Sequence, residues 1–367
     1  MSRPRRPANR PGRPAGVVVH NSDGVNPYAA ELASLLCRDG APVTLVDAAN
    51  SDSRPAAGVR WRRLLPKNFS HASPAAQVVA LVRGLAATVA GSVLHGQVVL
   101  VAFTRFPAED LVLAALAAAG RPVVLVVHNP VPREHESAPA RFARRTLLTR
   151  ALVVVIHAER LRGRLDTARR GPVVVCPHPP YLEVAPSGAA DVVLDPTRSW
   201  VAFIGALRWD KGAGLLPEIL AHVPEARRRG LGLVVCGRGS LPDAAWAAIR
   251  TSGVEVCDLT SAEPVPQDLL LEVLRHRPLV LAPYVAATQS GSVILALSLG
   301  CRVLAFDEGG IPDVLTADGL VPTGDVGAMG RAIGEGRGGT AVDEVPRWAE
   351  HAARSWTDVV QRAAASG

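Results

Sequence analysis

The sequence predicts an α/β protein made of two doubly wound, Rossmann-like domains in tandem. A chain of 367 residues is longer than a single hydrophobic core normally supports, so two domains are expected. Short apolar runs alternate with helical patterns, which is typical of parallel sheets with crossover helices. The runs are continuously apolar rather than alternating, which predicts sheets covered on both faces. We expect the active site in the cleft between the domains, at the carboxyl ends of the strands.

The first half begins with an apolar run at residues 16–20 and a polar loop, Asn21-Ser22-Asp23-Gly24. A helical pattern through Leu36 follows, and then a second apolar run at residues 43–46. This order of strand, glycine loop, helix and strand is the βαβ unit. Further strands are predicted at residues 98–103, 123–127, 152–156 and 173–176.

The same pattern begins again near residue 200. Strands are predicted at residues 200–204, 231–236, 254–257, 279–282 and 303–306, with a helix at residues 215–223 after the first of them. Residues 183–199 are rich in Pro, Gly, Ser and Asp and predict a linker. The expected layout is a basic tail at 1–15, an acceptor-binding domain at 16–182, the linker, a donor-binding domain at 200–345, and a helix at 346–367 that packs back on the first domain, with Trp356 as its anchor.

The net charge of +7 lies mostly in the tail. Five arginines fall within the first fifteen residues, and removing them leaves 35 basic against 33 acidic residues. We therefore predict a disordered tail and no nucleic-acid partner. The five cysteines never form a CxxC pair, which indicates reduced thiols, a cytoplasmic protein and no zinc site. The longest apolar helical pattern, residues 111–119, is too short to span a bilayer, and no signal peptide is predicted.

The first chemical motif follows the strand at residues 200–204. Gly205-Ala206-Leu207-Arg208-Trp209-Asp210-Lys211-Gly212 places Arg208 and Lys211 three residues apart before a helix. Two cations at the carboxyl end of a strand suit a phosphate or diphosphate. The alternative is a surface pair that bridges local acids such as Asp210. Only Lys67 and Lys211 among 40 basic residues are lysine, which suggests that arginine would not serve at position 211.

Two more loops of the second half carry the same kind of signal. Residues 283–292 end in Gln289-Ser290-Gly291-Ser292 before an apolar helix, whose first backbone N–H groups are free to hold an anion. Ordinary capping by Ser290 or Ser292 explains only part of this pattern. Gly309 and Gly310 follow the next strand and allow close approach of a ligand or a tight turn. All three loops follow parallel strands and are expected at one edge of the sheet.

With these stretches the second half resembles the donor domain of GT-B glycosyltransferases, specifically the retaining family-4 group of the group-1 type. The resemblance extends to Val234–Gly239, Gly309–Asp313 and Gly319–Asp325, and in the first half to Asn26-Pro27-Tyr28 and His128-Asn129-Pro130. It implies a metal-independent hexosyltransferase without a cofactor, which uses a UDP- or GDP-linked sugar. It also implies a role in assembling cell-envelope polysaccharide or another glycoconjugate.

The resemblance assigns roles residue by residue. Arg208 and Lys211 would hold the diphosphate, and His128 would lie beside the transferred sugar as a third catalytic residue, unless it merely caps a strand end. The other donor-binding positions would be Gly205, Gly237, Gln289, Ser290, Gly291, Ser292, Gly309 and Gly310. The acceptor side would comprise Asp23, Gly24, Asn26 and His128. A sugar, a lipid-linked sugar or a small molecule would be the acceptor.

Two features keep other functions open. Family members often carry two glutamates eight residues apart, and Ala287 and Leu295 stand at these positions. A catalytically inactive homologue that only binds a partner is therefore one alternative. The other is an NAD(P)-dependent enzyme, because Gly237-Arg238-Gly239 follows a strand and Asp258 follows at a suitable distance, although Pro242 replaces the third glycine.

Four histidines and two basic loops are candidates for contact with the acceptor. His20, His128, His157 and His178 each end a predicted strand but lack the spacing of metal ligands. The loops at residues 67–73 and 133–145 are expected to meet the acceptor. The second is rich in arginine and suits anionic lipid, or else is a solvated helix face. We expect a cytoplasmic protein that contacts the inner face of the membrane.

Overall fold

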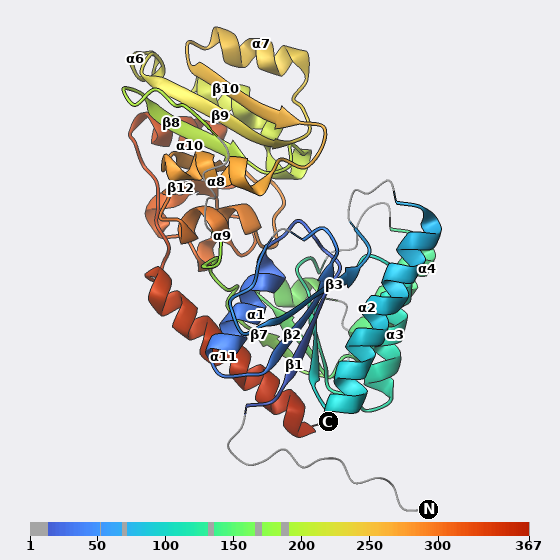
Figure 1. Cartoon of the computed structure of the whole chain (residues 1–367). Helices are drawn as coiled ribbons and strands as arrows, with labels where there is room; N and C mark the ends of the chain where they lie inside the picture. The colour runs from blue at the N-terminus through green and yellow to red at the C-terminus, as the bar shows by residue number, and fades with distance from the viewer. Residues whose placement is uncertain are drawn as a thin grey trace, which may run out of the picture. The chain divides into compact units, whose positions relative to one another are not determined.

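The computed structural model describes residues 14–51, 53–67, 72–130, 136–165, 171–184 and 191–366. The chain forms two compact units, one of Met1–Pro179 with Pro346–Gly367 and one of Pro180–Val345 (Figure 1). The expected tail at 1–15 lies outside the described residues up to residue 13. So do parts of the loops at 67–73 and 133–145 and of the linker at 183–199. The described linker residues 191–198 belong to the second unit, in which Val192 and Leu194 are buried.

The first domain contains a parallel sheet of seven strands among the described residues, in the order β3-β2-β1-β4-β5-β6-β7. The strands β2 and β3 follow on one side of β1, and β4 to β7 follow on its other side. β1 and β4 therefore flank the switch point, which is where doubly wound sheets bind ligands. The strands are β1 (Val17–Asn21), β2 (Val43–Ala48), β3 (Arg60–Leu65), β4 (Val98–Phe103), β5 (Val123–Val126), β6 (Val153–Ile156) and β7 (Val173–Val175).

Helices cover both faces of this sheet, which explains why its inner strands are continuously apolar. Figure 1 shows α2, α3 and α4 on one face and α1 with α11 on the other. On the first of these faces the apolar side chains of α3 and α4 pack with the strands into a core around Val99, Val101 and Leu113. The helices are α1 (Tyr28–Arg38), α2 (Pro74–His95), α3 (Pro107–Ala118), α4 (Ala138–Arg150) and α11 (Val345–Ser366).

The helix α11 closes the first domain through two tryptophans. Trp348 and Trp356 are both buried, and their indole nitrogens donate hydrogen bonds of 2.8 and 3.1 Å to the carbonyl oxygens of His178 and Pro177. Buried side chains recur along α11 at helical spacing, so one face of the helix packs inward. Thr357 also hydrogen-bonds Asp39 just after α1.

The second domain contains a parallel sheet of six strands among its described residues, in the order β10-β9-β8-β11-β12-β13. Its switch point lies between β8 and β11. The strands are β8 (Ser199–Ile204), β9 (Leu231–Arg238), β10 (Glu255–Ser261), β11 (Leu279–Ala282), β12 (Val303–Phe306) and β13 (Leu320–Val321). The helices are α5 (Leu216–Ala221), α6 (Glu225–Arg228), α7 (Asp243–Thr251), α8 (Gln267–Arg275), α9 (Gly291–Ser298) and α10 (Val326–Gly334).

Every strand predicted from an apolar run is present, and β3 and α2 are among the elements that were not predicted. The edge strand β3 escaped prediction because its exposed arginines break the apolar pattern. The expectation that residues 111–119 form the longest apolar helix is wrong. The longest is α2, with 22 residues and a mean hydropathy of 1.6, which by length and composition alone suffices to cross a membrane. Its glycines and alanines concealed it in the sequence, and in the structure it packs against the sheet.

We expect Trp356→Ala to lower the free energy of unfolding by roughly 3–5 kcal/mol, because the substitution leaves a large cavity and an unpaired carbonyl at Pro177. Urea denaturation measures this change. Trp209→Ala is the matched control, since Trp209 is 69% exposed and its loss should change stability by less than about 0.5 kcal/mol. Equal stabilities of the two variants would contradict the anchoring role of Trp356.

Candidate functional site

The loop after β8 carries two cations that are held in different ways. The guanidinium of Arg208 donates to both carboxylate oxygens of Asp210, at 2.9 and 2.7 Å, so its charge is largely balanced. The backbone carbonyl of Asp210 accepts hydrogen bonds from the N–H groups of Val285 and Ala286. Asp210 therefore fixes Arg208 by its side chain and ties this loop to the loop after β11 by its backbone.

Lys211 lies against an aromatic ring instead of an acid. Its Nζ is 3.9 Å from the ring centroid of Tyr284, a residue that is only 1% exposed. The hydroxyl of Ser290 donates to the Tyr284 hydroxyl at 3.3 Å and accepts the N–H of Val293, which caps α9. Lys211, Tyr284 and Ser290 thus form a chain of contacts from the β8 loop to the N-terminus of α9.

Glycines allow these loops to touch through their backbones. A Cβ on Gly212, whose φ is +66°, would lie 1.8 Å from the carbonyl oxygen of Pro283. A Cβ on Gly237 would lie 1.6 Å from the carbonyl oxygen of Gly205. Other backbone approaches of this kind join Gly309 to Ala287 and Gly310 to Thr288, and a Cβ on Gly205 would lie 3.0 Å from the side-chain oxygen of Ser292.

The predicted donor-binding residues of the second domain therefore gather at one edge of the sheet. This edge is the carboxyl end of β8 and β11, the two strands that flank the switch point. Lys211, the N–H groups of Gly291 and Ser292 at the start of α9, and the outer N–H groups of Arg208 supply positive charge there. Such an arrangement can bind a diphosphate. Gly237 serves to pack the loops, which weakens the dinucleotide interpretation of Gly237-Arg238-Gly239.

The two positions at which the resemblance would place glutamates carry buried apolar residues. Ala287 is 6% exposed and Leu295 is 5% exposed, and Leu295 lies on the buried side of α9. Neither position offers a carboxylate to a ribose or a sugar hydroxyl.

At the carboxyl edge of the first sheet, His128 belongs to a cluster of aromatic rings. It stacks on Phe103 with a centroid distance of 4.1 Å and meets Tyr28 edge-on at 4.4 Å. His157 and His178 complete the cluster, 5.1 Å from each other and each in contact with Tyr28. Within the described part of the chain, the buried Nε2 of His128 has no hydrogen-bond partner.

Burial keeps these three imidazoles uncharged. It lowers the pKa of His157 from 6.5 to about 4, although a hydrogen bond from Nδ1 to the carbonyl of Cys176 works in the opposite direction. The pKa values of His128 and His178 lie well below 6.5 because of burial and the nearby His157. The cluster is therefore neutral near pH 7 and can exchange hydrogen bonds with an uncharged ligand.

The predicted acceptor-side residues of the first loop stabilise that loop. Asp23 accepts the N–H of Val25, and Asn26 accepts the N–H of Tyr28 at the start of α1. A Cβ on Gly24 would lie 2.8 Å from the side-chain oxygen of Asn50. These residues lie after β1, in the same domain as His128 but apart from the donor set, which belongs to the second domain.

Sequence reasoning missed a buried polar network beside this loop. His20 hydrogen-bonds Thr88 of α2 and Glu109 of α3, each at 3.0 Å, and Ser22 donates to the same carboxylate. Burial alone would raise the pKa of Glu109, but hydrogen bonding and the charge of His20 hold the pKa below its usual range. Glu109 also accepts the N–H of Phe106, so the network fixes the loops after β1 and β4. His20 ends the apolar run of β1, and nothing in the local sequence indicates its pairing with Glu109.

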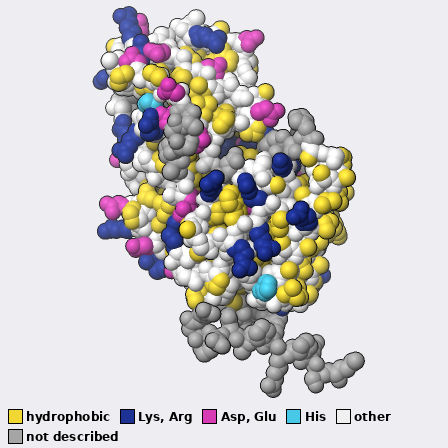
Figure 2. Space-filling view, viewed as in Figure 1, with side chains coloured by type: hydrophobic (Ala, Val, Ile, Leu, Met, Phe, Trp, Pro, Cys, Tyr) yellow, Lys and Arg dark blue, Asp and Glu magenta, His cyan; other side chains and the backbone are white. Residues whose placement is uncertain are grey.

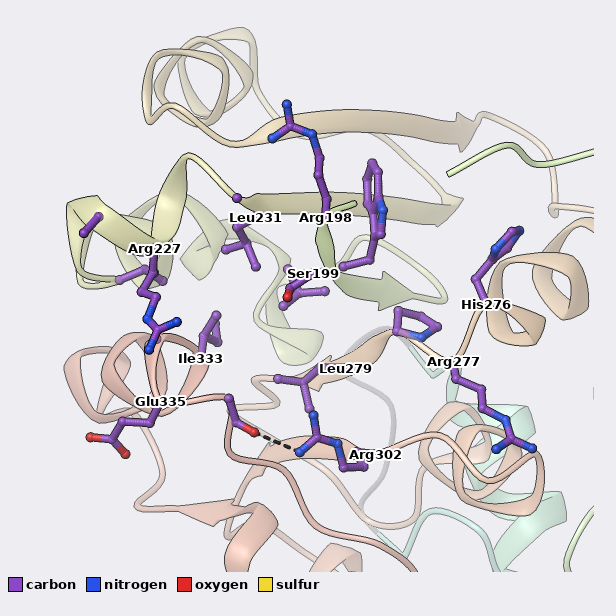
Figure 3. Close-up of a pocket in the computed structure, with 18 residues that line it drawn as sticks. Arg198, Ser199, Arg227, Leu231, His276, Arg277, Leu279, Arg302, Ile333 and Glu335 are labelled. Carbon is purple, nitrogen blue, oxygen red and sulfur yellow. Dashed lines mark hydrogen bonds between the residues drawn. The ribbon is translucent and has the colours of Figure 1, made fainter. Parts of the chain in front are cut away.

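A cavity of about 550 Å³ lies at the opposite, amino edge of the second sheet (Figure 3). It is lined by Arg198, Arg227 and Arg302, among others. Arg198 donates to the carbonyl of Arg229 after α6, and Arg302 donates to the carbonyl of Gly336 after α10. Arg198 and Arg302 thus satisfy carbonyls at helix ends, so we assign these two arginines a structural role. Across the described residues, no group of three or more His, Cys, Asp or Glu side chains is placed to hold a metal ion.

Comparison with solved structures shows the fold. Sucrose-phosphate synthase from Thermosynechococcus elongatus superposes with a TM-score of 0.61 at 15% identity, covering 95% of this chain and 94% of that one. HepE from Anabaena, solved in complex with UDP, gives 0.56 at 17% identity and 95% coverage of both chains. WaaG, a glycosyltransferase involved in lipopolysaccharide biosynthesis, gives 0.56 at 15% identity, with 95% and 98% coverage. No curated protein matches the chain.

These two parallel-sheet domains are the GT-B fold. Residues 198–335 match the family description "Glycosyl transferases group 1", and this segment contains the whole donor-type set of residues. Residues 198–335 are therefore similar to a group 1 glycosyltransferase domain, and the whole chain shares the GT-B fold of the solved structures.

The histidine cluster predicts how stability depends on pH. Because the pKa of His157 is lower in the folded chain than in the unfolded chain, the unfolded chain binds the proton first as the pH falls. The contribution of His157 to stability is complete above pH 6.5 and is lost progressively down to about pH 4, by about 3 kcal/mol in all.

Denaturation of the wild type and His157→Asn across this pH range measures the effect. The asparagine amide retains a donor toward Cys176 but does not titrate, so the variant should lose less stability toward acid. Asp110, whose pKa burial raises to about 6, acts in the opposite sense in both proteins and cancels in the difference. His351→Asn, on the exposed side of α11, controls for the substitution itself. Parallel curves for wild type and His157→Asn would rule out the effect.

Proposed function

We propose that the chain transfers a sugar from a nucleotide-diphosphate donor to a hydroxyl acceptor, with retention of anomeric configuration and without a metal. The observation that carries this proposal is the contact chain of Lys211, Tyr284 and Ser290 at the N-terminus of α9. It places a lysine and open backbone N–H groups at the switch point of the domain that matches the family. A UDP complex is known for HepE, which shares the fold.

The proposed chemistry is electrostatic stabilisation of the leaving group. Negative charge grows on the nucleoside diphosphate as its bond to the sugar breaks, and donors fixed before the reaction stabilise that charge most effectively. Lys211 lies against the ring of Tyr284, and α9 is held by its Ser290 cap, so neither needs to reorganise. Arg208, oriented by Asp210, offers its remaining N–H groups to the diphosphate.

Retention and metal independence rest on sequence arguments. The sequence contains no Asp-x-Asp, the motif of metal-dependent transferases of the other major fold. In the retaining family-4 group that the chain resembles, the leaving phosphate assists deprotonation of the acceptor hydroxyl. With Ala287 and Leu295 in place of glutamates, donor binding would depend on the diphosphate and on backbone contacts from Gly205, Gln289, Gly309 and Gly310.

On the acceptor side we assign His128. Its neutral imidazole, with Nε2 unpaired among the described residues, suits a sugar hydroxyl, which can both donate and accept a hydrogen bond. Asp23, Gly24 and Asn26 shape the neighbouring loop. We place the reaction in the cytoplasm, in the assembly of a cell-envelope polysaccharide or a related glycoconjugate, and no cofactor beyond the nucleotide-sugar is proposed.

A thermal-shift screen against UDP, GDP, NAD(H) and the corresponding nucleotide-sugars tests the function directly. A ligand that binds the native state alone raises the melting temperature, by an amount equivalent to about 2.7 kcal/mol at a hundred times its Kd. We expect stabilisation by UDP or GDP and their sugars, and none by NAD(H). The reverse result would overturn the assignment in favour of a dinucleotide enzyme. Binding without hydrolysis or transfer would indicate an inactive homologue.

We expect Lys211→Ala to lower turnover of the nucleotide-sugar found in that screen by about 10²–10³-fold, because a cation is lost from the leaving group. Donor hydrolysis supplies the assay before an acceptor is known. Lys67→Ala, at the other lysine of the sequence, is the matched control. Its loop is expected to meet the acceptor, which the hydrolysis assay does not contain, so this variant should hydrolyse the donor at the wild-type rate. Lys211→Arg should recover only part of the activity, because the larger planar guanidinium replaces the compact ammonium on Tyr284. If Lys211→Ala keeps most of its activity, Lys211 has no catalytic role.

A further inference from the structure

The helix α2 exposes much of its apolar surface and places small and polar residues against the sheet. The residues that face the sheet are mostly small or polar: Gly84, Leu85, Thr88, Gly91 and Ser92. A helix that covers a sheet normally turns its apolar side inward and its polar side to water. In α2 several large apolar side chains point outward instead, with Val79 and Val82 57% and 59% exposed and Leu94 72% exposed, while Leu81 and Val89 pack against the core.

Close packing explains the inner side of α2. A Cβ on Gly84 would lie 2.3 Å from the side chain of Leu65, and one on Gly91 would lie 3.3 Å from Val18. Small residues are therefore needed where α2 rests on the strands. Nothing in the domain explains the outer side, because valine and leucine are not required for solubility or for helix formation.

The exposed apolar surface continues onto the neighbouring helices. Leu111 of α3 is 43% exposed and Phe142 of α4 is 67% exposed. Figure 1 shows α2, α3 and α4 together on one face of the sheet, and apolar side chains gather over this side in Figure 2. We call this surface, formed by the exposed Val78, Val79, Val82, Leu94, Leu111 and Phe142, the outer face.

Arginines predominate around the outer face, and Glu136, the described acid just before α4, is paired with Arg144. Arg83 projects from the exposed side of α2, and Arg141 and Arg145 flank Phe142 on α4. The edge strand β3, which packs beside α2, exposes three more: Arg60, Arg62 and Arg63. In α2, α3 and α4, all fully described, the acids are Glu109 and Asp110, and both are buried. The border is thus positively charged.

We propose that the outer face docks on the surface of an anionic lipid bilayer. The valines, Leu94 and Phe142 would enter the boundary between headgroups and acyl chains, while the arginines extend to anionic headgroups. A second copy of the chain fits less well, because pairing two such faces would bring arginines against arginines. The helix lies on the bilayer and does not cross it, because its other side packs on the sheet.

This inference rests on the proposed function and adds the chemical class of the acceptor to it. A transferase whose first domain lies on a lipid surface finds its acceptor there, so the acceptor class becomes a lipid-linked sugar or lipid. The residues involved belong to the first domain alone, and none of them is assigned to donor binding. Arg141, Phe142 and Arg145 lie in the stretch at 133–145 that is expected to meet the acceptor, which agrees with an acceptor at the lipid surface.

Sedimentation with vesicles tests the proposal on the full-length chain. The vesicles are phosphatidylcholine alone and phosphatidylcholine with phosphatidylglycerol. We expect binding to the anionic vesicles that weakens with salt, and at least tenfold weaker binding for the double variant Val79→Glu, Val82→Glu. Val342→Glu is the matched control, because Val342 is 55% exposed and lies in the second domain. Arg141→Gln with Arg145→Gln should weaken binding to the anionic vesicles only.

Several outcomes would overturn the docking. One is wild type that fails to bind anionic vesicles. Another is equal binding by wild type and the Val79→Glu, Val82→Glu variant, which would assign binding to the arginine-rich tail that both retain. A third is a dimer that this variant dissociates in analytical ultracentrifugation, with no vesicle binding. Urea denaturation shows that the first domain of the variants is folded, and nucleotide binding is measured on the same samples. The nucleotide measurement separates the two proposals, because lost vesicle binding with retained nucleotide binding leaves the transferase assignment intact.

Discussion

The second domain depends on backbone segments that approach each other without side chains between them. Gly237 lies against Gly205, and Gly212 lies against Pro283, so closely that a Cβ atom on either glycine would overlap the facing carbonyl group. These contacts bring the loops after β8, β9 and β11 together at the switch point. Replacing either glycine would separate the loops, and the ammonium of Lys211 would then lose its place on Tyr284. The geometry of the charged residues is thus a consequence of backbone packing.

The two domains offer chemically opposite environments. At the carboxyl edge of the second sheet the groups are positive, with Lys211 held against the ring of Tyr284 and Arg208 oriented by Asp210. At the same edge of the first sheet the groups are aromatic and uncharged, because burial suppresses protonation of His128, His157 and His178. A diphosphate suits the first environment and sugar hydroxyls suit the second. The same distinction follows from the residues without any reference to the family.

The sequence predicted the architecture well because continuous apolar runs mark strands buried on both faces, such as Val98–Phe103. It did not predict β3, because the side chains of this strand are largely exposed arginines. It did not predict α2, because this helix exposes several large apolar residues, whereas a helix that covers a sheet normally buries them. Lys211, Ser290 and the glycines of the donor set were predictable because they follow strands that share an edge. Tyr284 under Lys211, the Asp210 link and the His20–Glu109 pair depend on contacts across the fold, which no local pattern records.

The division of the chain has a consequence for its synthesis on the ribosome. The first domain consists of two separate segments, since α11 belongs to it, whereas the second is continuous and complete at residue 345. Domains generally fold as units, and N-terminal ones first, as the chain emerges. Here the later domain has all its residues while the earlier one still lacks the helix that carries Trp348 and Trp356. A nascent chain truncated before α11 therefore contains a complete second domain and an incomplete first domain. The part of the first sheet that α11 covers is then exposed, and chaperones can bind there.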